Sequence, residues 1–293
     1  MIPLVDIVSL LQQKSISGTP AERGLAKVIL ADVEGAATSS IAALAEKAGV
    51  SEPTVTRLAT SLGLEGTRDL KMQLAKALAI GGSYLNEEGK AVSLGEGKAL
   101  ATICNFAVRA INDLKSVISE EQIEEISGHI AKASKVQLLG TGGMSSMAAQ
   151  VMEFRLFRLG LNVTTNVDGR LQRMNAALAN PETVVVGFSL SGDASSVIDA
   201  LNIARQYGAI TVAVTPPDTP LARIANHLLP YRYVEDGQIY KPNSAQFALL
   251  ALVDAIAFKT AEIIGPAVIE NLRRIKQTLT ISESYDASVP LGD

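Results

Sequence analysis

Apolar residues in the first 80 positions recur at intervals of three or four, the spacing that predicts amphipathic helices. The pattern runs through Val5–Leu11 and Leu25–Leu30, continues through residues 41–62, and returns in Asp69–Ala79. We therefore predict a small all-α domain over residues 1–80.

Residues 41–62, IAALAEKAGVSEPTVTRLATSL, have the pattern of two short helices joined by a sharp turn. Ala45 stands where the helices must cross closely, Gly49 at the turn and Val55 in the shared core, a spacing typical of helix-turn-helix units. Ser51 is the predicted N-cap of the second helix, and Pro53 lies in its first turn, where a missing N–H costs little. The other positions predicted to be buried are Leu44, Ala48, Val50 and Leu58. This segment predicts a DNA-binding domain.

The polar residues of the second helix are the candidates for contact with double-stranded DNA, because they lie outside the predicted core. Hydroxyl groups can meet bases or phosphates, and the planar guanidinium of Arg57 can grip guanine or phosphate. Residues 1–80 are formally neutral, but positions 57–76 carry a local excess of positive charge, where we expect phosphate contacts. The alternative is an ordinary helical hairpin with a solvated face. The candidate DNA-binding residues are Ser51, Glu52, Thr54, Thr56, Arg57, Thr60, Arg68 and Lys71.

Helical periodicity stops in residues 81–98, which are rich in glycine and polar residues and predict a linker. Residues 99–133 return to helical spacing. From residue 135 the chain alternates between short apolar runs that end in Gly or Ser and amphipathic helices, which predicts a parallel sheet flanked by helices. The five predicted strands are KVQLLG, LNVTTN, TVVVGFS, AITVAVT and HLLPYRY.

The predicted fold class is thus an all-α helix-turn-helix domain (1–80) joined by a linker (81–98) to an α/β domain (99–293) with a five-stranded parallel sheet. The helices expected around this sheet cover residues 145–159, 169–179, 194–207, 219–226 and 244–263, followed by the closing segment PAVIENLRRIKQTL.

Two loops at the carboxyl ends of predicted strands have the composition of an anion site. GTGGMSS (140–146) and SLSGDASS (189–196) each lead from a strand into a helix, where free N–H groups favour a bound phosphate. A dinucleotide site is the alternative for the first loop. It requires GxGxxG and an acidic residue about 20 positions further on, whereas this chain has Ser145 or Ser146 at the last position and no acid between Asn162 and Asn166.

Composition narrows the remaining function classes. With no apolar run of about 18 residues and no basic leader, the chain is expected to be cytoplasmic and to have no membrane partner. The single cysteine, Cys104, excludes an intrachain disulfide and is expected to be buried. With only His129 and His227 available, no zinc cluster is recognisable, and we expect neither metal nor cofactor. The absence of Trp argues against stacking on single-stranded nucleic acid.

GxGxxS paired with SxSGxx after two parallel strands resembles the sugar isomerase (SIS) domain, over about residues 120–262. With the helix-turn-helix in front of it, nearly the whole chain resembles the RpiR family of bacterial transcription regulators. Residues 40–57, 70–79 and 272–279 are most similar to family members that control hexose and gluconate catabolism and respond to 2-keto-3-deoxy-6-phosphogluconate. The resemblance implies a regulator with operator DNA and a phosphosugar effector as partners.

The resemblance also implies which residues hold the phosphate. Because the first loop is one residue longer than the usual form, Ser145 and Ser146 remain alternatives, and Ala194 stands where a Thr often completes the phosphate cup. Each serine alone could instead be a helix N-cap, and Arg155 is either a ligand contact or a surface residue. The implied ligand-binding residues are Gly142, Ser145, Ser146, Ser189, Ser191, Gly192 and Arg155.

An aldose–ketose isomerase is the alternative function, and it needs a base near the sugar carbonyl. The candidates are weak: Asp254 stands in an apolar run that favours a structural carboxylate, and Glu153 and His227 have no evident acid–base partner. We therefore expect a sensor without catalytic activity. A homodimer or homotetramer would present two helix-turn-helix domains to paired half-sites.

Overall fold

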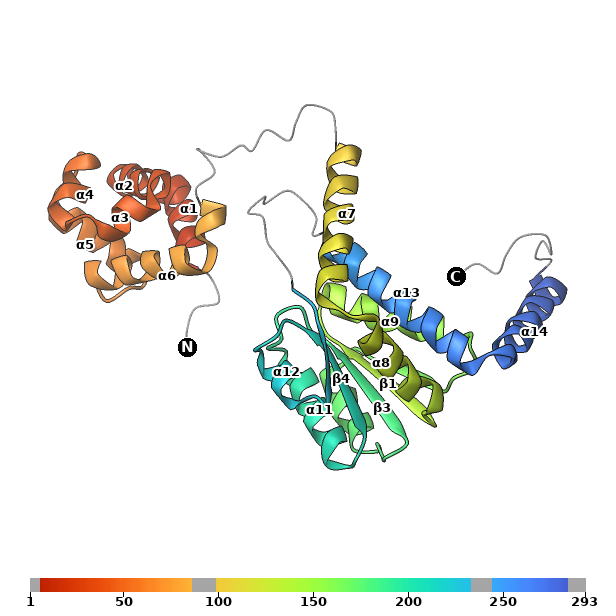
Figure 1. The fold of residues 1–293 in the computed structure, drawn as a ribbon. Coiled ribbons are helices and arrows are strands. Elements are labelled where there is room, and N and C mark those ends of the chain that lie inside the picture. Colours follow the sequence, from red (N-terminus) through yellow and green to blue (C-terminus); the bar gives the residue numbers. More distant parts are fainter. Residues whose placement is uncertain (1–5, 86–98, 233–243, 284–293) are drawn as a thin grey trace. The chain divides into compact units, whose positions relative to one another are not determined.

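The computed structural model describes residues 6–85, 99–232 and 244–283 and divides the chain into two compact units (Figure 1). One unit contains only helices, and the other contains a parallel sheet with helices on both faces. None of the helices in the described part of the chain combines the length and apolarity needed to cross a bilayer.

The helical unit is built around one apolar core, as the spacing predicts. Its largest fully buried side chains include Leu11, Leu25, Ile29, Leu58 and Leu70, which come from four different helices. The helices are α1 (Ile7–Ser17), α2 (Pro20–Ala31), α3 (Val33–Thr38), α4 (Ile41–Lys47), α5 (Glu52–Ser61) and α6 (Thr67–Leu85).

Helix α6 runs five residues beyond the predicted domain boundary at residue 80. Gly81 departs from helical angles, with φ −136° and ψ 21°, yet the helix continues to Leu85. The glycine pair therefore marks a local irregularity in α6, whereas its composition had indicated the start of the linker. Positions 86–98 of the predicted linker lie outside the described residues.

The second unit confirms the prediction of a five-stranded parallel sheet. Its strands are β1 (Lys135–Gly140), β2 (Val163–Asn166), β3 (Thr183–Phe188), β4 (Ile210–Thr215) and β5 (His227–Pro230). Its helices are α7 (Ala99–Val117), α8 (Glu120–Lys132), α9 (Gly143–Phe157), α10 (Gly169–Ala176), α11 (Ser195–Gln206), α12 (Pro220–Ile224), α13 (Ala245–Ile264) and α14 (Pro266–Glu283).

The strand order is β2-β1-β3-β4-β5, so the chain adds β2 on one side of β1 and β3 on the other. Strands β1 and β3 are paired in parallel, with Gly140 opposite Phe188. The loops that follow these two strands therefore leave the sheet side by side. In open α/β sheets such a switch point is where ligands bind.

Two apolar layers hold helices against the sheet. One face packs on α8, α9 and α13 through residues such as Val186, Phe188, Met152 and Leu252, and the other packs on α10, α11 and α12. Strand β3 is buried along its whole length because helices cover it on both sides.

Helix α7 differs from the prediction for Cys104. It has no fully buried residue, and only its carboxyl-terminal half packs on the core, through Ala110 and Leu114. Cys104 lies in the other half and is exposed, so the expectation of a buried thiol was wrong. The apolar run around it does not pack against the sheet.

Candidate functional site

The turn between α4 and α5 has the geometry that the sequence predicts. Ala45 and Val55 are buried in the shared core, and Gly49 has φ +64°, a conformation that favours glycine. The N–H of Val50 donates to the carbonyl of Ala45 at 2.9 Å, which closes the turn. Ala48 is half-buried and packs against the same core. The two helices thus form a compact pair with one outward face.

The start of α5 differs from the prediction at Thr54. Ser51 holds the N-cap position, but its side chain makes no capping bond, and its Oγ instead lies 3.0 Å from Thr54 Oγ1. Thr54 is only 7% exposed and accepts a hydrogen bond from Arg57 Nη2 at 3.0 Å. Thr54 therefore faces inward beside Val55 and not outward as predicted. Its hydroxyl holds the guanidinium of Arg57 in place.

The remaining candidates on α5 form a continuous polar surface. Glu52, Thr56, Arg57 and Thr60 are exposed, spaced at one helical turn or less. On the first turns of α6, Arg68 is exposed and Lys71 is half-buried. These residues are free of the apolar core and available to a double helix.

Helix α4 is also tied to the start of α3 by charge. Lys47 Nζ lies 2.7 Å from Asp32 Oδ2, and Asp32 Oδ1 caps α3 by accepting from the Gly35 N–H. The Lys47 ammonium and the Gly35 N–H hold the pKa of Asp32 below its ordinary value. The carboxylate thus fixes α4 relative to the helix that precedes it.

The first of the two loops predicted to bind an anion is short and tightly folded. Strand β1 ends at Gly140 and α9 begins at Gly143, with Gly142 between them at φ +76°. A Cβ at Gly140 would clash with the backbone of Ser145, so the helix starts directly against the strand end. Ser145 is buried at this contact, while Ser146 is half-buried.

The second loop is held by its own serines. Ser189 Oγ accepts from the Gly192 N–H at 3.0 Å, and Ser191 Oγ accepts from the Asp193 N–H at 3.3 Å. Gly192 has φ +71°, and a Cβ there would overlap Thr219, the N-cap of α12. Each hydroxyl that accepts in this way keeps its proton for a ligand oxygen.

Neither helix that begins at these loops is capped by a side chain. The N-caps of α9 and α11 are Gly142 and Ala194, with no side-chain capping bond at either. By contrast, a side chain caps α8, α10 and α12. None of the candidate serines is therefore the N-cap of α9 or α11. The first N–H groups of both helices remain for an anion.

Gln172 is a residue of this site that the sequence pattern did not reveal. It is fully buried, and its Nε2 donates to the carbonyls of Gly140 at 3.0 Å and Asn166 at 2.8 Å, at the ends of β1 and β2. It therefore fixes the strand end from which the first loop leaves. Periodicity gave no signal because the role depends on neighbours 32 and six residues away.

Arg155 does not lie with these loops. It is in the last turn of α9, 12 residues and about 18 Å along the helix from Gly143. Its Nε donates to Asp254 Oδ1 at 2.8 Å, which ties α9 to α13. Arg155 thus links two helices in this structure, and its contact with a ligand stays a prediction.

The three residues considered for isomerase chemistry do not converge. Asp254 is paired with Arg155 and is therefore the satisfied structural carboxylate that the sequence predicts, although its side chain is half-exposed. Glu153 Oε1 accepts from the Thr165 N–H at 3.3 Å. His227 is the first residue of β5, at the amino end of the sheet, opposite to the anion-binding loops.

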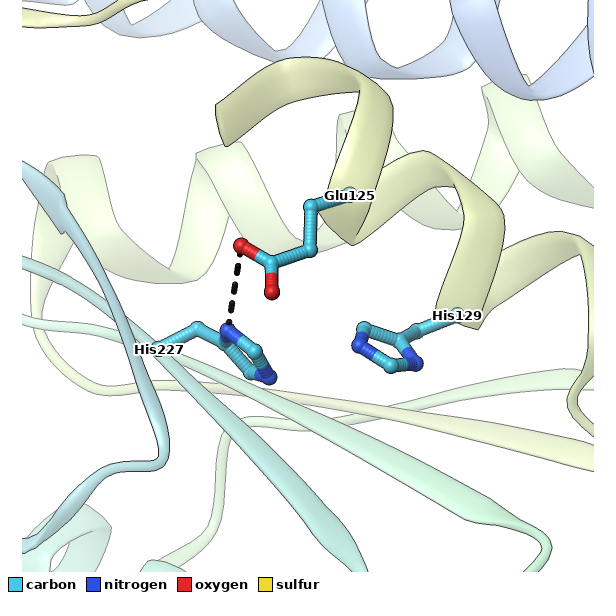
Figure 2. A group of neighbouring side chains, drawn as sticks. All are labelled: Glu125, His129 and His227. Atoms are coloured by element: carbon cyan, nitrogen blue, oxygen red, sulfur yellow. Dashed lines mark ion pairs between the residues drawn. The ribbon is translucent and has the colours of Figure 1, made fainter. Parts of the chain in front are cut away.

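His227 instead meets two residues of α8. Its Nδ1 lies 3.5 Å from Glu125 Oε2, and its ring centroid lies 4.9 Å from that of His129 (Figure 2). Burial and the neighbouring His227 hold the pKa of His129 below its ordinary value. The sequence showed only two histidines far apart, so it gave no sign of this cluster.

Comparison with known proteins identifies both units. Residues 5–81 match the helix-turn-helix domain of the rpiR family, and residues 129–258 match the SIS domain. The chain is 31% identical over 261 residues to the HTH-type transcriptional regulator HexR of Pseudomonas aeruginosa, covering 88% of this chain and 90% of that protein. It is 32% identical over 276 residues to HexR of Escherichia coli (strain K12), covering 93% and 94%.

A solved structure extends the likeness in fold to nearly the whole chain. It is the Vibrio vulnificus NanR protein complexed with ManNAc-6P, which is 21% identical, covers 95% of this chain and 99% of its own, and has a TM-score of 0.59. Both HexR relatives are HTH-type transcriptional regulators. With its helix-turn-helix and its SIS domain, this chain belongs to the RpiR family of transcriptional regulators and is of the HexR type.

Proposed function

We propose that the SIS domain binds a phosphorylated sugar or sugar acid and that this binding changes the affinity of the helix-turn-helix domain for operator DNA. The observation that carries the proposal is the pair of loops after β1 and β3, where two uncapped helix N-termini and the serine hydroxyls meet at the switch point of the sheet. Phosphate is the ligand chemistry that such a site favours.

The phosphate contacts are assigned to backbone N–H groups and to side chains on both loops. Ser189 and Ser191 donate from the second loop and Ser145 or Ser146 from the first, while Gly142 and Gly192 let the backbone approach the ligand. The NanR structure contains ManNAc-6P, which supports a phosphosugar as the class. Similarity to HexR favours 2-keto-3-deoxy-6-phosphogluconate as the effector.

The DNA contacts are assigned to α5 and the start of α6. Ser51, Glu52, Thr56, Arg57 and Thr60 face base edges or nearby phosphates, and Arg68 and Lys71 contact the backbone. A homodimer or homotetramer supplies the second helix-turn-helix for a paired half-site. The effector changes DNA affinity because it binds the two arrangements of the assembly unequally.

Calorimetric titration of the full chain tests the ligand class. We expect 2-keto-3-deoxy-6-phosphogluconate to bind with one site per chain, the unphosphorylated sugar acid not to bind, and Ser189→Ala/Ser191→Ala to lose at least about tenfold in affinity. Ser282→Ala, which removes an exposed hydroxyl from α14, is the control. Equal affinity for the phosphorylated and unphosphorylated acids would contradict the phosphate site. Binding of a different sugar phosphate, without binding of 2-keto-3-deoxy-6-phosphogluconate, would overturn the choice of effector and keep the phosphate site.

A further inference from the structure

The cluster of Glu125, His129 and His227 is held in place by the fold. Glu125 and His129 are one helical turn apart on α8, so their side chains share a face. Gln122, on the same stripe, donates to the carbonyl of Leu228 in β5 at 3.2 Å. This bond shows that the stripe faces the edge strand on which His227 lies.

Strand periodicity turns His227 toward the same helix. Side chains alternate along a strand, so every second residue from His227 lies on the same side. On that side Leu229 and Tyr231 pack in the core beneath α8, α9 and α13. His227 continues that side at the rim, where its side chain points toward Glu125 and His129 (Figure 2). Three possible ligands from two elements therefore converge on one point.

We propose that Glu125, His129 and His227 form a binding site for a transition metal ion of the zinc class. Two imidazole nitrogens and a carboxylate oxygen are the donor set of three-ligand zinc sites. The imidazoles disfavour Mg²⁺ and Ca²⁺, which take oxygen ligands.

The distances fit such an ion after a small closure. One candidate ligand atom from each residue lies within 4.8 Å of the others. A tetrahedral zinc ion with bonds of about 2.0–2.2 Å places its ligand atoms about 3.4 Å apart. Binding therefore needs a closure of up to about 1.4 Å, which side-chain rotation can supply because Glu125 is exposed and both histidines are half-buried. A fourth position of the ion stays open to water or to another ligand.

The site is separate from the proposed phosphosugar site. His227 begins β5 and His129 precedes β1, whereas the anion-binding loops follow the carboxyl ends of β1 and β3. A bound ion would join α8 to the edge strand and stabilise the SIS domain. It would not contact the phosphate.

Zinc titration of the full, tag-free chain tests the proposal. The protein is treated with EDTA, freed of chelator and titrated with Zn²⁺ against a chromophoric competitor, with Cys104→Ser as the background because the exposed thiol could bind Zn²⁺ by itself. We expect one Zn²⁺ per chain and an increase in melting temperature on binding. His129→Gln and His227→Gln should each weaken binding about 100-fold or more.

Glu124→Gln is the matched control, since Glu124 is an exposed neighbour on the same helix that is outside the cluster. It should bind Zn²⁺ as the background does. Circular dichroism of every variant establishes that the fold is intact. The absence of a micromolar site, or a site that persists in both histidine variants, would show that the cluster is only an ion pair beside two packed imidazoles.

Discussion

At the residue scale, Arg57 is the side chain of α5 best placed to read a base. Its Nη2 is anchored on the buried hydroxyl of Thr54, and its exposed position leaves the other donors of the guanidinium free. We expect Arg57→Ala to weaken operator binding by about 1–3 kcal/mol while leaving effector affinity unchanged. Fluorescence anisotropy with DNA selected from a random pool measures this. Lys27→Ala, which removes an exposed charge from α2, is the control, and an equal loss in both variants would reduce the role of Arg57 to general charge.

Gly192 gives a second prediction at this scale. Its φ of +71° and the overlap that a Cβ there would have with Thr219 both disfavour a side chain. Gly192→Ala should lower the free energy of unfolding by about 1–3 kcal/mol and weaken phosphosugar binding, because the second loop must shift. Gly128→Ala, on α8 and outside both loops, is the control, since a Cβ there would meet nothing within 4 Å and its φ is not positive. Urea denaturation measures the free energy of unfolding and calorimetry measures the phosphosugar affinity. If both values in the Gly192 variant equal those of the native sequence, the role assigned to this turn is contradicted.

At the element scale, a capping box fixes the start of α2. Glu22 Oε2 accepts from the Thr19 N–H at 2.8 Å, and Thr19 Oγ1 accepts from the Glu22 N–H at 3.3 Å. The Thr19 N–H, the hydroxyls of Ser61 and Thr19 and the Lys14 charge together lower the pKa of Glu22 to about 2. The ionised carboxylate therefore stabilises this helix and the end of α5.

The sign of the pH dependence follows from that shift. Because the folded pKa of Glu22 lies below its ordinary value of 4.5, its contribution is complete above pH 4.5 and is lost as the pH falls toward 2. Glu22→Gln keeps an acceptor but removes the charge, and should cost about 1 kcal/mol at pH 7 and progressively less below pH 4.5. Urea denaturation followed by circular dichroism measures the difference. A constant difference from pH 7 to pH 3, or the same profile in Glu46→Gln, would contradict this account.

The sequence predicted elements well because helix and strand periods are local. The five strands and the turn at Gly49 depend on spacing within a few residues, and all are confirmed. The inward turn of Thr54, the pairing of Arg155 with Asp254 and the bridge made by Gln172 depend on neighbours from other turns or elements. Their chemistry was visible in the sequence, but their partners were not.

At the scale of the whole molecule, two separately folded units must be coupled for the protein to act as a sensor. In the proposed function, DNA binds the helical unit and the effector binds the loops of the SIS domain, so the two ligands occupy different units. If the effector changes the affinity for DNA by some factor, linkage requires that DNA change the affinity for the effector by the same factor. The sign of the effect depends on which arrangement the effector prefers.

The measurement that tests this most directly is the DNA affinity of the full chain with and without saturating 2-keto-3-deoxy-6-phosphogluconate. The protein with its native sequence should show at least a fivefold change in Kd, on the order of 1 kcal/mol of coupling. Ser189→Ala/Ser191→Ala should bind the same DNA and show no such change. An unchanged Kd at an effector concentration that calorimetry shows to be saturating would contradict the account, because the SIS domain would then bind the phosphosugar without regulating the DNA contact.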